Sequence, residues 1–163
     1  MNQTRFLSLT AVAMFLVQSV TLMLSPLLVD LAAEFGVSVA AAGQLAAVTF
    51  AAWAVSVISV GPISDSFGRR SVAVTGLTFL SISVLASAFA PTFGVLLALR
   101  VVTGLSGGMI PPNSMAAVAD VIAPAKRAWA FGLLMAFASL SGVVGVPGWR
   151  WWPAPADGVS HSR

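Results

Sequence analysis

Long uncharged stretches of apolar residues constrain this chain more than any other feature of its sequence. Of its 163 residues, 58% are hydrophobic and only 8% are charged. A soluble domain is about 25% charged, so this chain has too little charge to cover a surface that faces water. About 20 apolar residues cross the hydrocarbon core of a bilayer as a helix. The sequence therefore predicts an all-α membrane protein with about five transmembrane helices, at residues 6–29, 39–60, 71–89, 93–121 and 128–146.

The composition argues against several other classes of protein. The first apolar stretch is longer than the core of a signal peptide, about 7–15 residues, and more spans follow it, so we expect it to be retained. The net charge of +3 comes from residues in turns rather than along one face, which argues against a nucleic-acid partner. The chain has no cysteine for a disulfide or a thiolate metal site. With no nucleophile–base pair, metal-ligand spacing or phosphate loop, we expect neither an enzyme nor a cofactor.

A short charged segment, Gly61 to Arg70, separates the second apolar stretch from the third. We expect Gly61 and Pro62 to end the second helix, because proline cannot continue the hydrogen-bond ladder. Gly68 permits the positive φ of a tight turn, and Asp65 can accept hydrogen bonds from the free N–H groups of a helix start. The alternative is an ordinary basic hairpin turn without a function of its own.

The charged segment fits a family pattern, Gly-x-Leu-(Ala/Ser)-Asp-(Arg)-x-Gly-Arg-(Arg/Lys). Ile63 replaces Leu and Ser66 replaces the first Arg, whereas the pattern is matched by Gly61, Ser64, Asp65, Gly68, Arg69 and Arg70. The segment thereby resembles the loop between helices two and three of the major facilitator superfamily, whose members are twelve-helix transporters. The resemblance implies a gating loop, in which Asp65 anchors the cytoplasmic gate.

Arg100 lies inside the fourth apolar stretch, about 10 Å from the start of the expected helix at 1.5 Å per residue. A charge at this depth is costly and is expected to face a cavity or a partner. Arg100 and Gly104 resemble the superfamily's second motif, Arg-x-x-Gln-Gly, with Thr103 in place of Gln. The resemblance implies a role of Arg100 in proton coupling and substrate binding. The alternative is that Arg100 snorkels to the outer interface of the membrane.

The fifth apolar stretch ends in Gly142, Gly145 and Pro147. These residues partly resemble the superfamily's helix-five motif of proton-driven exporters, Gly-x-x-x-Gly-Pro-x-x-Gly-Gly, although one extra residue precedes the proline and the final glycine pair is absent. Two prolines follow within residues 148–163, a polar tail that we expect to be aberrant and unable to form a sixth helix. The resemblance covers residues 5 to about 147, and only the first part of a twelve-helix transporter.

The basic residues lie on one side of the expected threading of the helices, at Arg5, Arg69, Arg70, Lys126 and Arg127. On the other side, the turn at residues 90–92 and an acidic loop from Asp30 through Glu34 to Ser38 contain no lysine or arginine. Ser38 is the expected N-cap of the second helix. The positive-inside rule predicts a cytoplasmic N-terminus. The expected location is a plasma membrane, the inner membrane of a bacterium.

Asp120 closes the fourth apolar stretch on the same side of the membrane as the two arginines of the charged segment. As the resemblance suggests, it pairs with Arg69 or Arg70. The alternative is a solvated carboxylate at the helix end, because exposed ion pairs contribute little.

The leading hypothesis for function is transmembrane transport of a small molecule. The resemblance implies proton-coupled efflux by a carrier of the drug:proton antiporter or sugar-efflux-like group, with the proton gradient as energy source. The alternative is a truncated, non-transporting membrane protein or an interaction subunit. The expected partners are the lipid bilayer, the substrate, and either a second copy of the chain or a missing C-terminal half. The substrate is not fixed by the sequence, because pocket residues in such carriers come from both halves.

Overall fold

The computed structural model describes residues 3–144, which contain six helices and no strand. The helices are α1 (Gln3–Glu34), α2 (Val39–Phe67), α3 (Arg69–Ser87), α4 (Phe93–Gly108), α5 (Ile110–Val121) and α6 (Pro124–Val144). Four helical stretches are long and apolar enough to cross a membrane, namely α1, α2, α3, and α4 with α5 as one span. The chain is therefore an all-helical, multi-pass membrane protein, and α6 adds a further helix of 21 residues.

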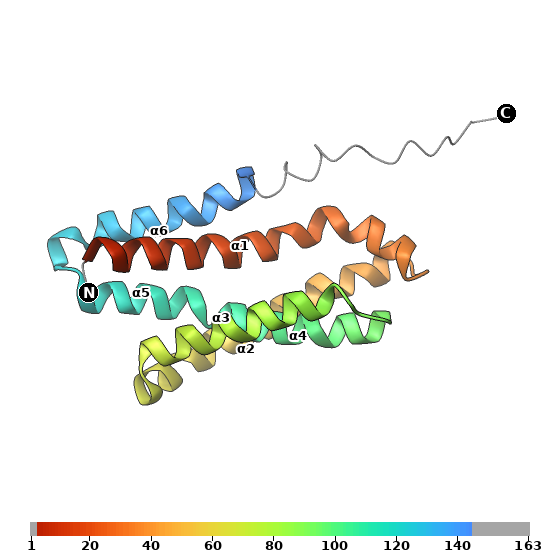
Figure 1. Cartoon of the computed structure of the whole chain (residues 1–163), viewed down its shortest axis with the longest axis horizontal. Coiled ribbons are helices and arrows are strands. Elements are labelled where there is room, and N and C mark those ends of the chain that lie inside the picture. Colours follow the sequence, from red (N-terminus) through yellow and green to blue (C-terminus); the bar gives the residue numbers. More distant parts are fainter. Residues whose placement is uncertain (1–2, 145–163) are drawn as a thin grey trace.

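The helices lie lengthwise beside one another in an elongated bundle, and all their junctions except the one between α4 and α5 lie at its two ends (Figure 1). The main packing partners are α1 with α6, and α4 with both α2 and α3. The start of α1 lies at the same end as the α2–α3 and α5–α6 junctions, whereas the α1–α2 and α3–α4 junctions lie at the other end (Figure 1). The first turns of α1, α3 and α6 contain the basic residues Arg5, Arg69, Arg70, Lys126 and Arg127. These five residues therefore share one end of the bundle.

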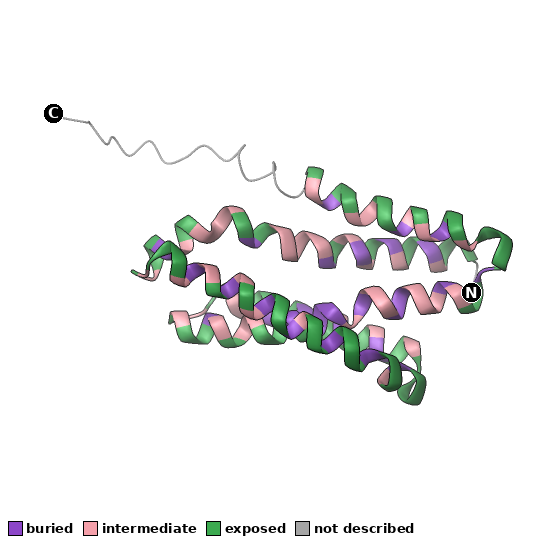
Figure 2. Ribbon diagram, turned by 180° about the vertical axis from the view of Figure 1, so that it is seen from behind, coloured by how far each residue is buried: buried purple, intermediate pink, exposed green. Residues whose placement is uncertain are grey.

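The core consists of three apolar clusters that follow one another along α1. At the basic end, Leu7 and Met14 pack against residues of α5 and α6. In the middle, Val17 meets Leu80 of α3 and Ile110 of α5. At the far end, the cluster is formed by Leu24, Leu45 and Leu96. Buried residues occupy the inner faces of the helices, and exposed ones the outer faces (Figure 2). Because many exposed side chains are large and apolar, as Ile58 and Phe89 are, this outer surface suits lipid.

Small residues let α4 approach α2 and α3 closely, as is common where helices meet in membranes. Gly107 lies against the ring of Trp53, so that a Cβ added there would stand 2.9 Å from it. The hydroxyl of Ser56 donates to the carbonyl oxygen of Leu105 at 2.6 Å. On the other side of α4, the hydroxyl oxygens of Ser83 and Thr103 lie 2.8 Å apart. The hydroxyls of Ser56 in α2 and Ser83 in α3 thus both find a partner on α4.

The first helix extends beyond its predicted bounds at both ends. Asp30 and Glu34 lie inside α1 and not in a loop, so the prediction of an acidic loop that starts at Asp30 is wrong. Pro26 also lies within the helix. A proline removes one N–H group and bends a helix, but the ladder can resume after it. The connection to α2 is left to a few residues, which include Gly36 with a φ of 63°. At its end the Ser38 hydroxyl accepts from the backbone N–H of Ala41 at 3.1 Å, the expected cap.

The prediction that Gly61 and Pro62 end the second helix is wrong, because α2 continues to Phe67 with Pro62 inside it. Helical hydrogen bonding resumes beyond the proline, and the Gly68 N–H donates to the Ser64 carbonyl at 3.0 Å. The turn before α3 is reduced to Gly68, whose φ of 84° favours glycine. As a result α3 begins at Arg69, earlier than predicted, and it ends at Ser87.

The fourth span is divided at Met109 into α4 and α5, just before Pro111 and Pro112. The following helix begins at Pro124 and not at Ala128, since proline suits the first position of a helix. Lys126 and Arg127 therefore lie in the first turn of α6. The predicted end of this helix at residue 146 and the predicted tail at 148–163 lie outside the described residues.

Candidate functional site

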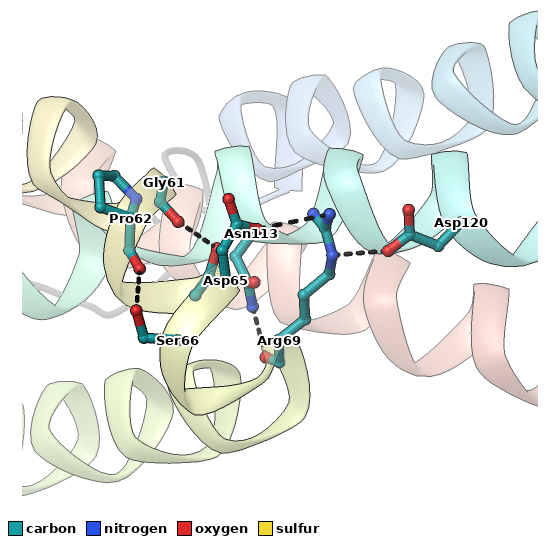
Figure 3. A network of polar contacts seen from close by, with 8 residues as sticks. Gly61, Pro62, Asp65, Ser66, Arg69, Asn113 and Asp120 are labelled. Carbon is teal, nitrogen blue, oxygen red and sulfur yellow. Dashed lines mark hydrogen bonds and ion pairs between the residues drawn. The ribbon is translucent and has the colours of Figure 1, made fainter.

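Arg69 is the centre of a charged network at the end of the bundle where α2 meets α3 (Figure 3). As the first residue of α3, it follows the single-residue turn at Gly68. Its Nε lies 2.6 Å from Oδ2 of Asp120 near the end of α5, and its Nη2 lies 3.8 Å from Oδ1 of Asp65. One guanidinium group therefore joins carboxylates from two helices that are distant in sequence.

Asp65 occupies the last turn of α2, one helical turn before Arg69. The start of α3 has no side-chain cap, so Asp65 does not cap this helix. Its side chain is 72% exposed. The neighbouring Arg70 is exposed, and among residues 3–144 no carboxylate lies within ion-pair distance of it. Gly61 lies on the exposed surface of α2, where an added Cβ would meet nothing within 4 Å.

Asn113 is a member of the network that the sequence argument missed. It follows the two prolines in α5, is only 3% exposed, and its Nδ2 donates to the backbone carbonyl oxygen of Arg69 at 2.7 Å (Figure 3). This bond fixes the start of α3 against α5. A buried amide in an apolar helix needs a partner, so Asn113 could have been recognised as a contact residue from the sequence. Its partner, 44 residues away, could not.

The ion pairs of this network are weak enough to break during a conformational change. The side chains of Arg69 and Asp120 are 30% and 56% exposed. Pairs this accessible to water contribute roughly 0–1 kcal/mol to stability. By contrast, the hydrogen bond that Asn113 donates to Arg69 is shielded from water, because Asn113 is buried. The arrangement therefore combines a fixed backbone contact with charges that can exchange partners.

Arg100 lies two turns into α4, far from this network, because α4 begins at the opposite end of the bundle (Figure 1). The structure thus does not bring Arg100 together with the charged loop. Its Nε is buried and has no hydrogen-bond partner among the described residues. Thr103, which stands where the family motif has Gln, donates to the Leu99 carbonyl at 2.9 Å and contacts Ser83. Thr103 therefore serves helix packing.

Gly104 lies one helical turn after Arg100 in α4, and Gly142 lies in α6, apart from the charged network. Gly104 packs against the backbone of α2, where a Cβ would stand 2.3 Å from the carbonyl oxygen of Thr49. Gly142 lies in α6, and a Cβ there would be 3.4 Å from Leu22 of α1. Close packing therefore requires glycine at position 104, whereas a Cβ at position 142 would make an ordinary van der Waals contact. Gly145 and Pro147 of the partial exporter motif lie outside the described residues.

Comparison with known proteins extends the resemblance to most of the chain. The family model of the Major Facilitator Superfamily matches residues 9–152. The uncharacterized MFS-type transporter YceJ of Bacillus subtilis is 28% identical over 134 residues, which are 82% of this chain and 34% of YceJ. The inner membrane transport protein YnfM of Escherichia coli is 31% identical over 120 residues, 74% of this chain and 29% of YnfM. The matched part is thus about a third of these relatives.

A second protein of Bacillus subtilis, the uncharacterized MFS-type transporter YybF, is 32% identical over 120 residues. The match covers 74% of this chain and 30% of YybF. All three relatives carry the name of a transporter. The residues that the family model matches include the helices that carry Arg69, Arg100 and Asp120.

Proposed function

Because this chain belongs to the Major Facilitator Superfamily, we propose that its helices are the first spans of a carrier that exports a small molecule in exchange for protons. Transport of a small molecule across a membrane is the activity of the family. The proposal adds that the carrier exports its substrate, is driven by protons, and lies in a bacterial inner membrane with its N-terminus in the cytoplasm. The alternative to this proposal is a membrane protein that does not transport.

The observation that carries the proposal is the ion pair between Arg69 and Asp120, with Asp65 beside it. Such carriers work by rocking parts of the molecule around a site in the membrane. A latch for this motion must hold one state and then release it. Partly exposed ion pairs have a suitable strength, because each is worth roughly 0–1 kcal/mol. Asp65, which is the more exposed carboxylate, is free to contact a further part of the carrier.

Arg100 supports the coupling part of the proposal. Arginine stays protonated in proteins, so Arg100 does not itself carry the transported proton. A positive charge held inside a span instead attracts an anionic substrate group or favours the ionised form of a nearby carboxylate. Its buried, unpartnered Nε leaves a donor for such a group. The structure describes no carboxylate beside it, and a carboxylate or substrate would have to complete this site.

The proposal can be tested in everted membrane vesicles that are energised to an acidic interior. A fluorescent pH indicator reports proton efflux when candidate substrates are added. Two proteins are compared, the chain itself and the chain joined to the part of YceJ that follows the matched region. We expect substrate-dependent loss of the pH gradient in at least the completed protein, and none in vesicles without either protein.

A matched variant tests the role of the exposed carboxylate in transport. Asp65→Asn removes the exposed carboxylate but keeps its size, and we expect it to lower the substrate-dependent signal without reducing the amount of protein in the membrane. If both proteins insert and neither responds to any of the substrates offered, the non-transporting alternative is favoured. If Asp65→Asn responds like the parent protein, the latch assignment is wrong even though transport is established.

A further inference from the structure

Helix α5 contacts Arg69 at two separate points (Figure 3). The Nδ2 of Asn113 donates to the backbone carbonyl oxygen of Arg69 at 2.7 Å, and Oδ2 of Asp120 lies 2.6 Å from the Arg69 Nε. Positions 113 and 120 are about two helical turns apart, so their side chains share one face of α5. This face therefore holds both the main chain and the side chain of the first residue of α3.

The guanidinium group of Arg69 has a second carboxylate within reach. Asp65 lies one helical turn earlier in the chain, and its Oδ1 is 3.8 Å from the Arg69 Nη2. This contact is local, because only Gly68 separates α2 from α3. The closer pair with Asp120 instead requires the start of α3 to lie against α5. The position of that start therefore decides which carboxylate Arg69 contacts more closely.

Little within the α2–α3 junction itself fixes the start of α3. Gly68 has a φ of 84°, in the region that favours glycine, and its position at the N-cap makes no side-chain hydrogen bond. Asn113 supplies a contact from outside the junction, because its bond to the Arg69 carbonyl ties the first residue of α3 to α5. The pair of Arg69 with Asp120 therefore depends on a hydrogen bond made by a third residue.

Stability alone does not account for an asparagine at position 113. The residue is only 3% exposed, and its Oδ1 has no hydrogen-bond partner within residues 3–144. A buried polar atom without a partner costs free energy. Leucine has a similarly branched side chain and would avoid this cost. The amide group is useful here for the one bond that it makes, the bond to Arg69.

We propose that Asn113 is a positioning residue of the charged network, whose hydrogen bond holds Arg69 where its guanidinium group pairs with Asp120 in preference to Asp65. The inference rests on the proposed function, in which this pair is the latch of the carrier. When Asn113 releases the Arg69 carbonyl, the start of α3 can leave α5, and Arg69 keeps only its local partner. One buried amide thereby controls the exchange of partners between two exposed carboxylates.

The first test measures the coupling between Arg69 and Asp120 on the purified chain in detergent, without transport. Double-mutant cycles with Arg69→Gln and Asp120→Asn are run in the parent chain and in Asn113→Leu, and circular dichroism follows unfolding. For the parent we expect a coupling of up to about fivefold in the unfolding equilibrium constant, the range of a partly exposed pair, and none in Asn113→Leu. Ser114→Ala is the control, because it removes the next buried polar side chain of α5 and leaves the Asn113 bond in place.

The stability of the single variant Asn113→Leu separates positioning from a structural role. Arg69 belongs to α3, so its carbonyl oxygen keeps the donor of a regular helix when Asn113 is replaced. We therefore expect Asn113→Leu to unfold no more easily than the parent chain. An unchanged coupling in Asn113→Leu would overturn this inference alone. Absence of coupling in the parent chain would overturn the latch, and the inference with it.

A second measurement uses transport, normalised to the amount of protein in the membrane. In the pH-gradient assay on the completed protein, we expect Asn113→Leu to lower the substrate-dependent signal as far as Asp120→Asn does. The two changes together should lower it no further than either alone, because both remove the same pair. A double variant whose loss is the product of the two single losses would show that Asn113 acts independently of the pair, and the positioning role would then be wrong.

Discussion

Gly104 of α4 lies so close to Thr49 of α2 that a methyl group on the glycine would stand 2.3 Å from the threonine carbonyl oxygen. The same methyl group would stand 2.8 Å from the Cβ of Ala52. Neither neighbour is the end of a flexible side chain, so the two helices would have to separate. The absence of a side chain at Gly104 therefore sets the distance between α2 and α4.

Gly104→Ala is expected to destabilise the bundle by about 1–3 kcal/mol, the usual cost of an overpacked core. Gly94→Ala in the same helix is the control, because a Cβ there meets nothing within 4 Å. Unfolding of both variants in detergent, followed by circular dichroism, measures the difference. Equal stability of the two variants would mean that α2 and α4 are less closely packed than described.

Asp120→Asn is expected to have a small effect on stability and a large one on transport. The partly exposed pair with Arg69 is worth less than about 1 kcal/mol. A double-mutant cycle with Arg69→Gln gives the coupling energy, and the pH-gradient assay on the completed protein gives the activity. Asp30→Asn, which removes an exposed carboxylate in α1, is the control. An activity loss no larger than that of Asp30→Asn would argue against a latch.

Replacing Arg100 should separate coupling from folding. Arg100→Lys keeps the charge but loses the planar fork of donors. Loss of one charged hydrogen bond costs about 1.5–3 kcal/mol, so we expect substrate-driven proton movement to fall on the order of tenfold or more. The variant should be inserted in normal amount, as membrane fractionation will show. Normal transport by both Arg100→Lys and Arg100→Ala would support snorkelling.

The orientation of the bundle is open to a direct test, because the chain has no cysteine of its own. Single cysteines are placed at Ser66, beside the basic end, and at Ala40, in the first turn of α2 at the other end. Both positions are exposed. With the basic end in the cytoplasm, a membrane-impermeant thiol reagent on intact cells should label Ala40→Cys and spare Ser66→Cys. The reverse pattern would invert the proposed topology.

Apolar stretches and cap residues in the sequence were sufficient to place the spans, but the ends of the helices were not predictable from prolines alone. Ser38 marks the start of α2 because a hydroxyl accepts from the N–H groups of a helix start. Pro62, which was expected to end the second helix, instead lies inside α2, since a single missing donor bends a helix without ending it. Flanking apolar sequence therefore predicts helix length better than one proline does.

For the site, the sequence identified the charges but not the contacts between them. The sequence placed Asp120 on the same side of the membrane as Arg69 and Arg70. It did not decide whether Asp120 pairs with one of them or is a solvated carboxylate. The choice depends on the packing of α5 against α3, which determines the position of Arg69. The hydrogen bond of Asn113 depends on the same packing. Contacts between distant helices require the three-dimensional structure.

The division of the fourth span at Met109 has a mechanical consequence. Pro111 and Pro112 have no N–H groups, so the carbonyl oxygens of Gly107 and Gly108, four residues earlier, lack the donors of a regular α-helix, and Gly107 accepts from the N–H of Met109 instead. A change in the angle between α4 and α5 therefore breaks no helical hydrogen bond at these two carbonyl groups. Since α4 packs mainly on α2 and α3 while α5 also contacts α1 and α6, this joint is a low-resistance bend between two otherwise stiff parts of the bundle.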